Sequence, residues 1–382
     1  MLYPHADRSP RQARAIIGLL AAVALTVTGC ASSGPRLDPF AYSPERLLVE
    51  VRAQAPEVPV DDFVVPYRVT PEMVARAREI VAGARTDLEK ADRLVRSITR
   101  ENGFGLAYNA VATSTPEVTL ERGYGNCLAL TSIFIGLARE LGMTAYYVDA
   151  SDLINDLRRG EEVIIDSGHI AGAVRTERGY TLVDFDGDVV RFRTFKIIDD
   201  VTALAHYYNN LGFEIMVEAQ QAGEPVPWEE ALRNFELATK VRPEFTLALN
   251  NLGVAYTRLD DLEAAETAYR MVIAIDPESD SAYHNLGNLQ SRRGDLLAAL
   301  SSYGEALKHR RRNPYLHYHR GVAQYRLGDL VGAEESFKRA ISLEREYIEP
   351  RNLLAQVYTQ QGRLEEAAKV RAAVSLILSQ RR

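Results

Sequence analysis

The sequence predicts an α+β domain followed by an all-α solenoid of helical repeats. Two observations predict this architecture. Between residues 67 and 200, helix patterns come first and short alternating strand patterns follow, which is typical of an α+β domain. From residue 246 onward, small and aromatic residues recur every 34 positions, which is typical of stacked helical hairpins. A chain of 382 residues is long enough for such separate units.

Composition narrows the class of protein. With 46% hydrophobic and 25% charged residues, the chain is expected to be globular, neither disordered nor an integral membrane protein. The formal net charge of -7 provides no basic field for phosphate backbones. We therefore expect no nucleic-acid partner.

The N-terminus has the pattern of an export signal over residues 1–29. Three arginines lie between residues 8 and 14, and an apolar run follows over residues 15–27, too short to span a bilayer as a mature helix. Val27-Thr28-Gly29-Cys30 resembles a bacterial lipobox. The resemblance implies cleavage before Cys30 and lipid attachment to its thiol. The alternative is a cysteine that only happens to lie near a cleavage site.

A lipid on Cys30 implies a membrane-bound mature protein, since each buried methylene contributes about 0.8 kcal/mol. Ala31 follows the cysteine, and in such lipoproteins a residue other than Asp there implies the outer membrane, facing the periplasm. Residues 30–66 are rich in proline and are expected to form a tether with at most a short helix.

The α+β domain is expected over residues 67–200. Thr70-Pro71-Glu72 predicts a helix start, residues 87–99 carry a second helical pattern, and a third helix is expected from about Asn126 to Leu141. Residues 101–124 are rich in Gly, Asn, Thr and Ser and predict a loop. Strands are expected near residues 144–148, 162–166, 168–175, 180–185 and 189–194.

The chain has two cysteines, and lipidation of Cys30 leaves Cys127 as a single thiol. Cys127 opens the third expected helix, where unpaired N–H groups and the helix dipole favour a thiolate. Gly123 and Gly125 precede it and allow the backbone to approach a substrate and hold an oxyanion. The alternative is a buried cysteine that acts only as a small hydrophobe.

A thiol nucleophile requires a base. Of seven histidines, His5 leaves with the export signal and four lie in the repeats, so His169 and His206 remain. His206 falls in an expected helix, whereas His169 stands on an expected strand, where the alternative is a satisfied histidine in a sheet. Asp184 and Asp186 on the next strand alternate to the same face, so periodicity does not choose between them as the group that orients the imidazole.

Gly125-x-Cys127, residues 137–143, Gly168-His169 and Leu182-Val183-Asp184 together resemble the bacterial transglutaminase-like superfamily, a relative of papain-like thiol enzymes. The resemblance covers roughly residues 70–200. It implies that Cys127 is the nucleophile, His169 the base and Asp184 the orienting carboxylate, and so favours Asp184 over Asp186.

Two positions depart from the pattern of this superfamily. Ile170 follows the histidine, where many members soon have an aromatic residue, and Asn126 precedes the cysteine, where many have an acid. An aromatic or amide side chain often assists the oxyanion hole in this superfamily. Tyr108, Asn109 and Asn126 are the candidates for that supporting role here.

The C-terminal period matches the tetratricopeptide signature, in which two helices approach closely where side chains are small. The columns with a step of 34 are Gly253, Gly287, Gly321 and Ala355; Ala265, Ala299, Ala333 and Ala367; and Tyr269, Tyr303 and Phe337. Residues 246–382 hold four repeats. Residues 228–243 keep the second half of an earlier one, and the helix near 203–220 departs from the spacing, so 201–245 is expected to be a junction with a degenerate repeat.

Such arrays hold extended peptides in a concave groove. Two sets of residues map to groove-facing positions: Asn250, His284, Tyr318 and Asn352; and Arg258, Arg292 and Arg326. A row of arginines is suited to carboxylates of an acidic or C-terminal peptide. The alternative is that these arginines only solvate helix ends. His317 and His319 are two residues apart, which is not metal-ligand spacing on one helix face, and no metal or cofactor is expected.

Together these patterns predict a lipid-anchored thiol acyl-transfer enzyme of the cell envelope. We expect a peptidase or amidase in preference to a transglutaminase, with a protein or peptide partner in the repeats. The alternative is a catalytically silent adaptor that scaffolds envelope complexes through its repeats.

Overall fold

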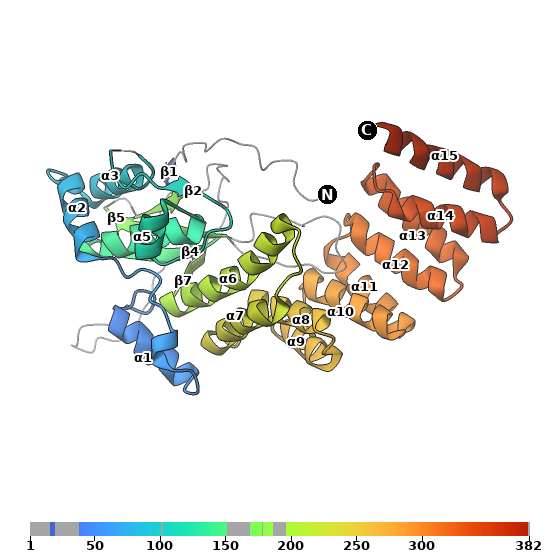
Figure 1. Cartoon of the computed structure of the whole chain (residues 1–382), viewed down its shortest axis with the longest axis horizontal. Helices are drawn as coiled ribbons and strands as arrows, with labels where there is room; N and C mark the ends of the chain where they lie inside the picture. The colour runs from blue at the N-terminus through green and yellow to red at the C-terminus, as the bar shows by residue number, and fades with distance from the viewer. Residues whose placement is uncertain are drawn as a thin grey trace. The chain divides into compact units, whose positions relative to one another are not determined.

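The computed structural model describes residues 16–19, 38–100, 102–150, 169–177, 179–185 and 196–380. The chain divides into two compact units, with the boundary between residues 248 and 249. The first unit holds a sheet and helices, and the second is helical (Figure 1). No helix in the described ranges combines the length and the apolar character needed to cross a membrane.

The first unit contains a five-stranded antiparallel sheet in the order β1-β6-β5-β4-β7. Its strands are β1 (Ile16–Leu19), β4 (Ala145–Asp149), β5 (Ile170–Thr176), β6 (Gly179–Asp184) and β7 (Lys196–Ile198). The expected strands near 144–148, 168–175 and 180–185 are thus confirmed, while those near 162–166 and 189–194 lie outside the described residues. β1 and β7 were not predicted, and β1 falls within the expected export signal.

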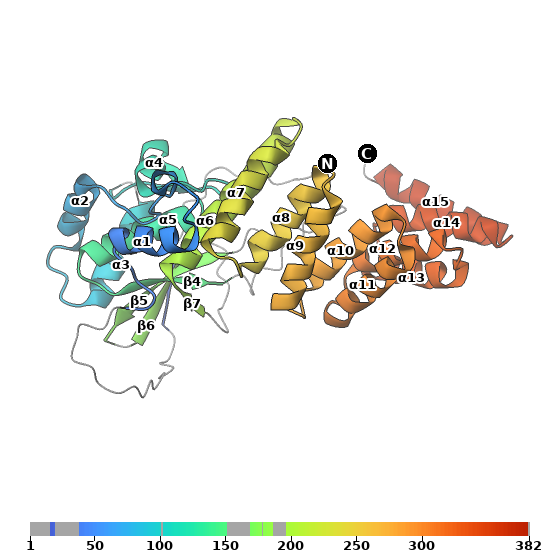
Figure 2. The same cartoon turned by 90° about the horizontal axis from the view of Figure 1, so that it is seen from below.

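The three helices that the sequence predicted in this domain begin at polar caps. They are α2 (Pro71–Val81), α3 (Asp87–Thr99) and α5 (Cys127–Glu140), and the side chains of Thr70, Thr86 and Asn126 accept hydrogen bonds from their first turns. Every residue of α5 from Cys127 to Ala138 is buried, which agrees with the lack of charge over that stretch. α3 and α5 contact the sheet, and Figure 2 shows the helices gathered above the strands.

The predicted loop over residues 101–124 contains regular structure instead. A short helix, α4 (Pro116–Arg122), ends at Gly123, whose φ of 78° is the left-handed conformation that glycine adopts without strain. β2 (Ala107–Tyr108) then pairs in parallel with β3 (Tyr124–Gly125). This small ladder brings Tyr108 and Asn109 beside the segment that leads into Cys127.

The expected tether is also corrected by the structure, because residues 38–66 pack onto the first unit. They form α1 (Pro44–Gln54) and a 3-10 turn, η1 (Val60–Asp62), and Leu47 and Val51 of α1 are buried in its core. A buried ion pair fixes the start of this segment at Tyr42. Arg139 donates two hydrogen bonds to Asp200, and Asp200 also accepts one from the backbone N–H of Tyr42.

Two further helices, α6 (Asp200–Ala222) and α7 (Trp228–Val241), belong to the first unit. A Cβ atom on Gly212 of α6 would lie 2.6 Å from the ring of Phe235 on α7. In the repeats of the second unit, Gly253, Gly287 and Gly321 face Tyr269, Tyr303 and Phe337 in the same way, at 2.5, 2.6 and 2.7 Å. The α6–α7 hairpin therefore packs as a repeat, but with a longer connection, and this is why periodicity did not identify its first helix.

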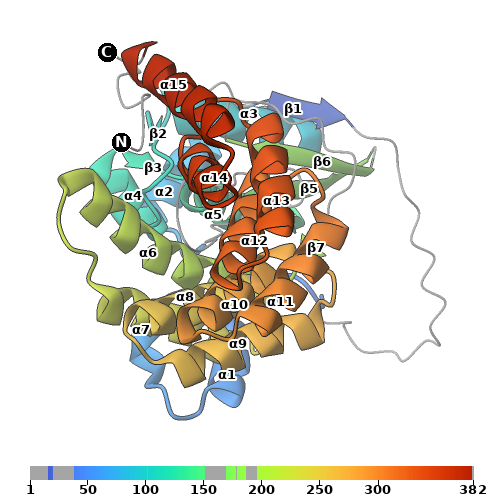
Figure 3. The same cartoon turned by 90° about the vertical axis from the view of Figure 1, so that its right-hand side faces the viewer.

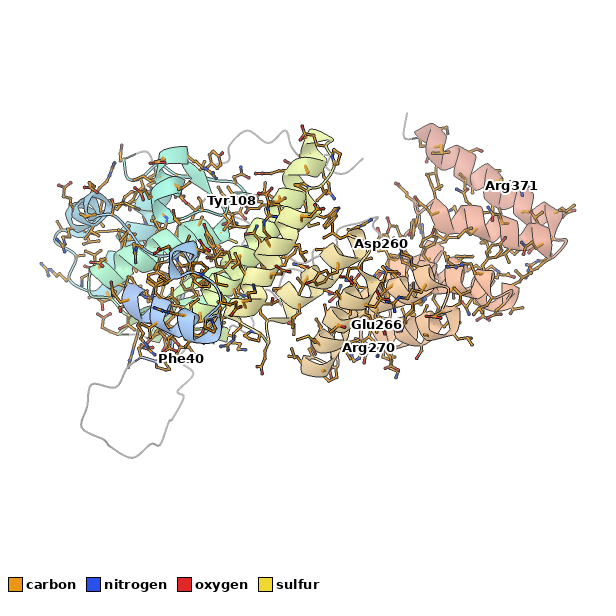
Figure 4. All side chains as sticks on the ribbon, turned by 60° about the horizontal axis from the view of Figure 1, so that its bottom comes forward. Phe40, Tyr108, Asp260, Glu266, Arg270 and Arg371 are labelled. Carbon is orange, nitrogen blue, oxygen red and sulfur yellow. The ribbon has the colours of Figure 1, made fainter. Side chains whose placement is uncertain are left out.

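The second unit stacks helical hairpins. Its helices are α8 (Thr246–Arg258), α9 (Leu262–Ile275), α10 (Asp280–Arg293), α11 (Leu296–His309), α12 (Pro314–Arg326), α13 (Leu330–Leu343), α14 (Glu349–Gln360) and α15 (Leu364–Gln380). The last hairpin, α14 and α15, faces the viewer in Figure 3. There Ala355 stands at the glycine position and Arg371 at that of the aromatic ring (Figure 4 labels Arg371).

Replacing Gly287 by Ala tests this packing. The added Cβ would meet the buried ring of Tyr303, and overpacking of this kind costs about 1–3 kcal/mol, more than the gain of about 1 kcal/mol in helix propensity. We expect a lower midpoint of urea unfolding measured by circular dichroism. Gly304→Ala, in the middle of α11 with nothing within 4 Å, is the control and should raise the midpoint. Equal shifts in both variants would contradict the packing argument.

Candidate functional site

The thiol of Cys127 lies at the N-terminus of the buried helix α5. Asn126 caps this helix in an extended conformation, and its Oδ1 accepts a hydrogen bond of 2.9 Å from the backbone N–H of Ala129. Cys127 is therefore the first residue of α5, where a helix has no acceptor of its own for the N–H groups. The residue is only 7% exposed, so little water surrounds the sulfur.

His169 stands directly before β5 and is 5% exposed. Its carbonyl accepts a hydrogen bond of 2.9 Å from the N–H of Ala150 at the end of the neighbouring strand β4, which fixes the backbone. Asp184 ends β6, the hairpin partner of β5. The two carboxylate oxygens of Asp184 each lie 3.2 Å from Nε2 of His169.

The imidazole of His169 also interacts with Cys127 through a side-chain hydrogen bond. Asp184 lies against Nε2 of the same ring. Burial by itself lowers the pKa of His169, but hydrogen bonds and charge interactions with Asp184 and Cys127 outweigh it and raise the pKa well above its ordinary value. A proton taken from the thiol is therefore held stably on the ring.

The structure thus brings together the three residues that the sequence proposed as a catalytic set. Asp186, the other carboxylate left open by periodicity, lies outside the described residues. Cys30, the expected lipidation site, lies outside them as well. His206 is not part of the site: it is fully buried in α6 with its ring centre 4.5 Å from that of Phe245, and burial lowers its pKa.

The three supporting candidates differ in their surroundings. Tyr108 is half-buried on β2, opposite Gly125 of β3. Asn109 is exposed, and its Oδ1 accepts from the N–H of Val111. Asn126 is buried with both ends of its amide committed to hydrogen bonds, so it supports the start of α5 and keeps no amide N–H for an oxyanion. Assistance to an oxyanion by Tyr108 or Asn109 stays a prediction.

The groove predictions for the repeats need correction. Asn250 and His284 are 2% and 1% exposed and lie inside the helical stack, where Asn250 accepts a hydrogen bond from Asn285. Asn352 is exposed and does not line the cavity of this unit. The first two members of this column therefore lie in the packing of the helices and not at a groove surface.

The remaining groove candidates do line a cavity of about 730 Å³ in the second unit. They are Arg258, Arg292, Tyr318 and Arg326, beside further tyrosines. Arg292 donates to the carbonyl of Thr257, and Arg326 to that of Ser291, each from one repeat to the helix end of the one before. These arginines therefore join successive repeats, in partial agreement with the alternative that they serve helix ends.

Sequence reasoning missed two residues at the thiol site. Thr113 and Glu214 form a buried hydrogen-bonded group with Asn126. Glu214 lies 88 residues from Asn126 in the sequence, on a helix assigned to the degenerate repeat. No local motif signals such a contact.

Fold and site together define a protein with a Cys-His-Asp thiol domain and an array of helical repeats. Comparison with known families agrees: residues 74–185 match the transglutaminase-like superfamily, and residues 246–279, 284–348 and 325–380 match tetratricopeptide repeat families. The chain therefore carries a transglutaminase-like domain followed by tetratricopeptide repeats. Its fold class is as predicted.

Individual proteins resemble parts of the chain. An uncharacterized protein, ycf37 of Pyropia yezoensis, is 35% identical over 82 residues, which are 22% of this chain and 42% of that protein. MamA from Desulfovibrio magneticus is 20% identical, with a TM-score of 0.41, over 46% of this chain and 96% of MamA. TTC0263, a tetratricopeptide protein of Thermus thermophilus, is 29% identical, with a TM-score of 0.36, over 43% of this chain and 88% of TTC0263.

The contact between Asp184 and His169 predicts a measurable change in titration. In Asp184→Asn the imidazolium loses its charged partner, so the pKa of His169 should fall by about one pH unit or more. Imidazole nitrogen chemical shifts, followed by NMR against pH, report the midpoint. Glu177→Gln, in the exposed turn between the same strands, is the control and should leave it unchanged. An identical midpoint in Asp184→Asn and the wild type would refute the assignment.

Proposed function

We propose that this chain is a lipid-anchored cell-envelope enzyme that transfers acyl groups through Cys127, acting as a peptidase or amidase in preference to a transglutaminase. The observation that carries the proposal is the contact of His169 with both Cys127 and Asp184 at the N-terminus of a buried helix. A thiol used only for packing requires neither an adjacent base nor a carboxylate behind that base.

The reaction would proceed in two steps. The thiol proton passes to the imidazole of His169 and the sulfur attacks an amide carbonyl carbon, forming a C–S bond. The N–H groups at the start of α5 would stabilise the oxyanion. The C–N bond then breaks, and the amine leaves with the proton from His169. Water or another amine attacks the thioester, the C–S bond breaks, and the thiol is restored.

Replacement of Cys127 by Ala tests the nucleophile. The variant should lose all labelling by a thiol-directed acyl probe, and mass spectrometry should place the adduct on Cys127 in the wild type. Labelling of Cys127→Ala at the wild-type level would exclude the proposed enzyme. A catalytically silent adaptor instead predicts that Cys127→Ala complements a deletion strain, whereas a truncation of the repeats does not.

The location at the membrane rests on the sequence Val27-Thr28-Gly29-Cys30. Cleavage there would remove β1 and leave β6 at the edge of the sheet in the anchored form. Cys30→Ser should abolish incorporation of a fatty-acid analogue and release the protein from the membrane fraction. Because Cys127 is a different thiol, the acyl probe should still label this variant. A Cys30→Ser protein that retains both the lipid and its membrane association would contradict the anchor.

The repeats supply the partner site in this proposal, and the family matches support a protein-binding role. The cavity presents Arg258, Arg292 and Arg326 together with Tyr315 and Tyr318, a combination suited to a peptide with carboxylates and apolar side chains. Each guanidinium has five donors, so an arginine that binds a neighbouring repeat keeps donors for a ligand.

An acidic peptide with a free C-terminal carboxylate, labelled with fluorescein, tests this site by fluorescence anisotropy. Arg326→Ala should weaken binding roughly tenfold, since a charge-assisted hydrogen bond contributes about 1.5–3 kcal/mol. Arg270→Ala is the control: this exposed arginine pairs with Glu266 on α9 and does not line the cavity (Figure 4). Unchanged affinity in Arg326→Ala would exclude the cavity as the binding site for this peptide.

A further inference from the structure

The carboxylate of Glu214 is buried at the N-terminus of the thiol helix. Glu214 lies on α6 and is 7% exposed. The backbone N–H of Thr113 donates to both of its oxygens, at 2.7 and 2.9 Å, and the Thr113 hydroxyl donates to Oε1 at 2.6 Å. Nδ2 of Asn126 donates to the same oxygen at 3.1 Å. One side chain thus joins two segments that are distant in the sequence.

The directions of these hydrogen bonds are fixed. Oδ1 of Asn126 accepts from Ala129 to cap α5, so its Nδ2 points to Thr113 and Glu214. Nδ2 donates to the Thr113 hydroxyl at 2.6 Å, which leaves that hydroxyl to donate its own proton to Glu214. Every group that meets the carboxylate is therefore a donor. An ionised carboxylate accepts all of them, whereas a neutral acid brings a proton of its own.

Burial of the Glu214 carboxylate costs desolvation free energy, so its presence inside the protein requires an explanation. Burial raises the pKa of Glu214 to about 7, against the hydrogen bonds from Thr113, which lower it. Of the charged groups that act on it, Glu218 on the same helix raises the pKa and Arg122 on α4 lowers it, while Glu214 in turn raises the pKa of Tyr207. A costly carboxylate beside a reactive group is typical of functional sites.

We infer that Glu214 is a positioning residue for Cys127: its ionised carboxylate holds Asn126 and the Thr113 segment so that α5 begins at the thiol in its reactive geometry. This inference rests on the proposed function, since it assigns a role within the same site. Glu214 lies outside residues 74–185, the part that matches the transglutaminase-like superfamily. The helical hairpin that follows the thiol domain therefore completes its site.

The α6–α7 hairpin is built to hold Glu214 in place. Gly212, two residues before it, packs against the ring of Phe235 on α7, and a Cβ there would lie 2.6 Å from that ring. α6 also contacts β4 and α1 of the same unit. A fragment that ends near residue 200 would keep Cys127, His169 and Asp184 but lose the carboxylate that fixes Asn126.

Glu214→Gln tests the role, because it keeps the shape but removes the charge and the titration. The readout is the rate of Cys127 alkylation by iodoacetamide between pH 5.5 and 8.5, values chosen to bracket about pH 7, in full-length Cys30→Ser protein. We expect the wild-type alkylation rate to rise through about pH 7, and we call this rise the alkylation limb. Glu214→Gln should react roughly tenfold more slowly and should lack the alkylation limb. Glu230→Gln, at an exposed position in the first turn of α7, is the control and should behave as wild type.

The direction in which stability changes with pH distinguishes a positioning role of Glu214 from a purely structural one. The pKa of Glu214 in the folded protein, about 7, lies above the ordinary value of 4.5. The contribution of Glu214 to the free energy of unfolding is therefore fully present below pH 4.5 and is lost as the pH rises through about 7. The melting temperature of the wild type should therefore fall relative to Glu214→Gln over the range in which alkylation of the wild type accelerates. A positioning role predicts these opposite trends, and parallel trends would overturn it.

Thr113→Val provides a second test if Glu214→Gln fails to fold. It removes the hydroxyl that lowers the pKa of Glu214, so the alkylation limb should move to higher pH. Wild-type rates and an unshifted limb in both variants would refute the role of Glu214. A different outcome would overturn the proposed enzyme and support the positioning role. In that outcome peptide substrates do not acylate Cys127, but its alkylation still depends on Glu214 as expected.

Discussion

The N-terminus of one buried helix is the constraint on which the thiol site depends. α5 is enclosed over its first twelve residues, so its leading N–H groups must find acceptors inside the protein. The Oδ1 atom of Asn126 satisfies one of them, and the rest of that amide is held by Thr113 and Glu214. Cys127 occupies the next position, where the helix field and His169 both act on the sulfur.

This arrangement also accounts for the asparagine that precedes the cysteine. Many members of the superfamily are expected to have an acid at that position, and this chain has Asn126. A carboxylate is still present nearby, but it arrives on α6 from 88 residues away. An amide at position 126 can cap α5 through its oxygen and donate to Glu214 through its nitrogen, whereas a carboxylate would repel Glu214.

Close approach of a glycine to an aromatic ring organises the repeats. The same contact recurs at Gly253, Gly287 and Gly321, and it extends to Gly212 in the hairpin that belongs to the first unit. In the last repeat both partners change together, to Ala355 and Arg371. One packing rule therefore spans the array and reaches the helix that carries Glu214.

The sequence by itself determined the features that repeat or are local. The period of 34 defined the repeats, and caps and apolar spacing defined α2, α3 and α5. The few cysteines and histidines left Cys127 with His169 or His206, and the family resemblance favoured His169. Tertiary structure decided what depends on contacts between distant segments: the packing of residues 38–66, the burial of Asn250 and His284, the contact of Asp184 with His169, and the carboxylate of Glu214. Periodicity shows which face of a helix or strand is apolar, but it does not show which distant side chain will contact that face. The thiol site consists of such long-range contacts.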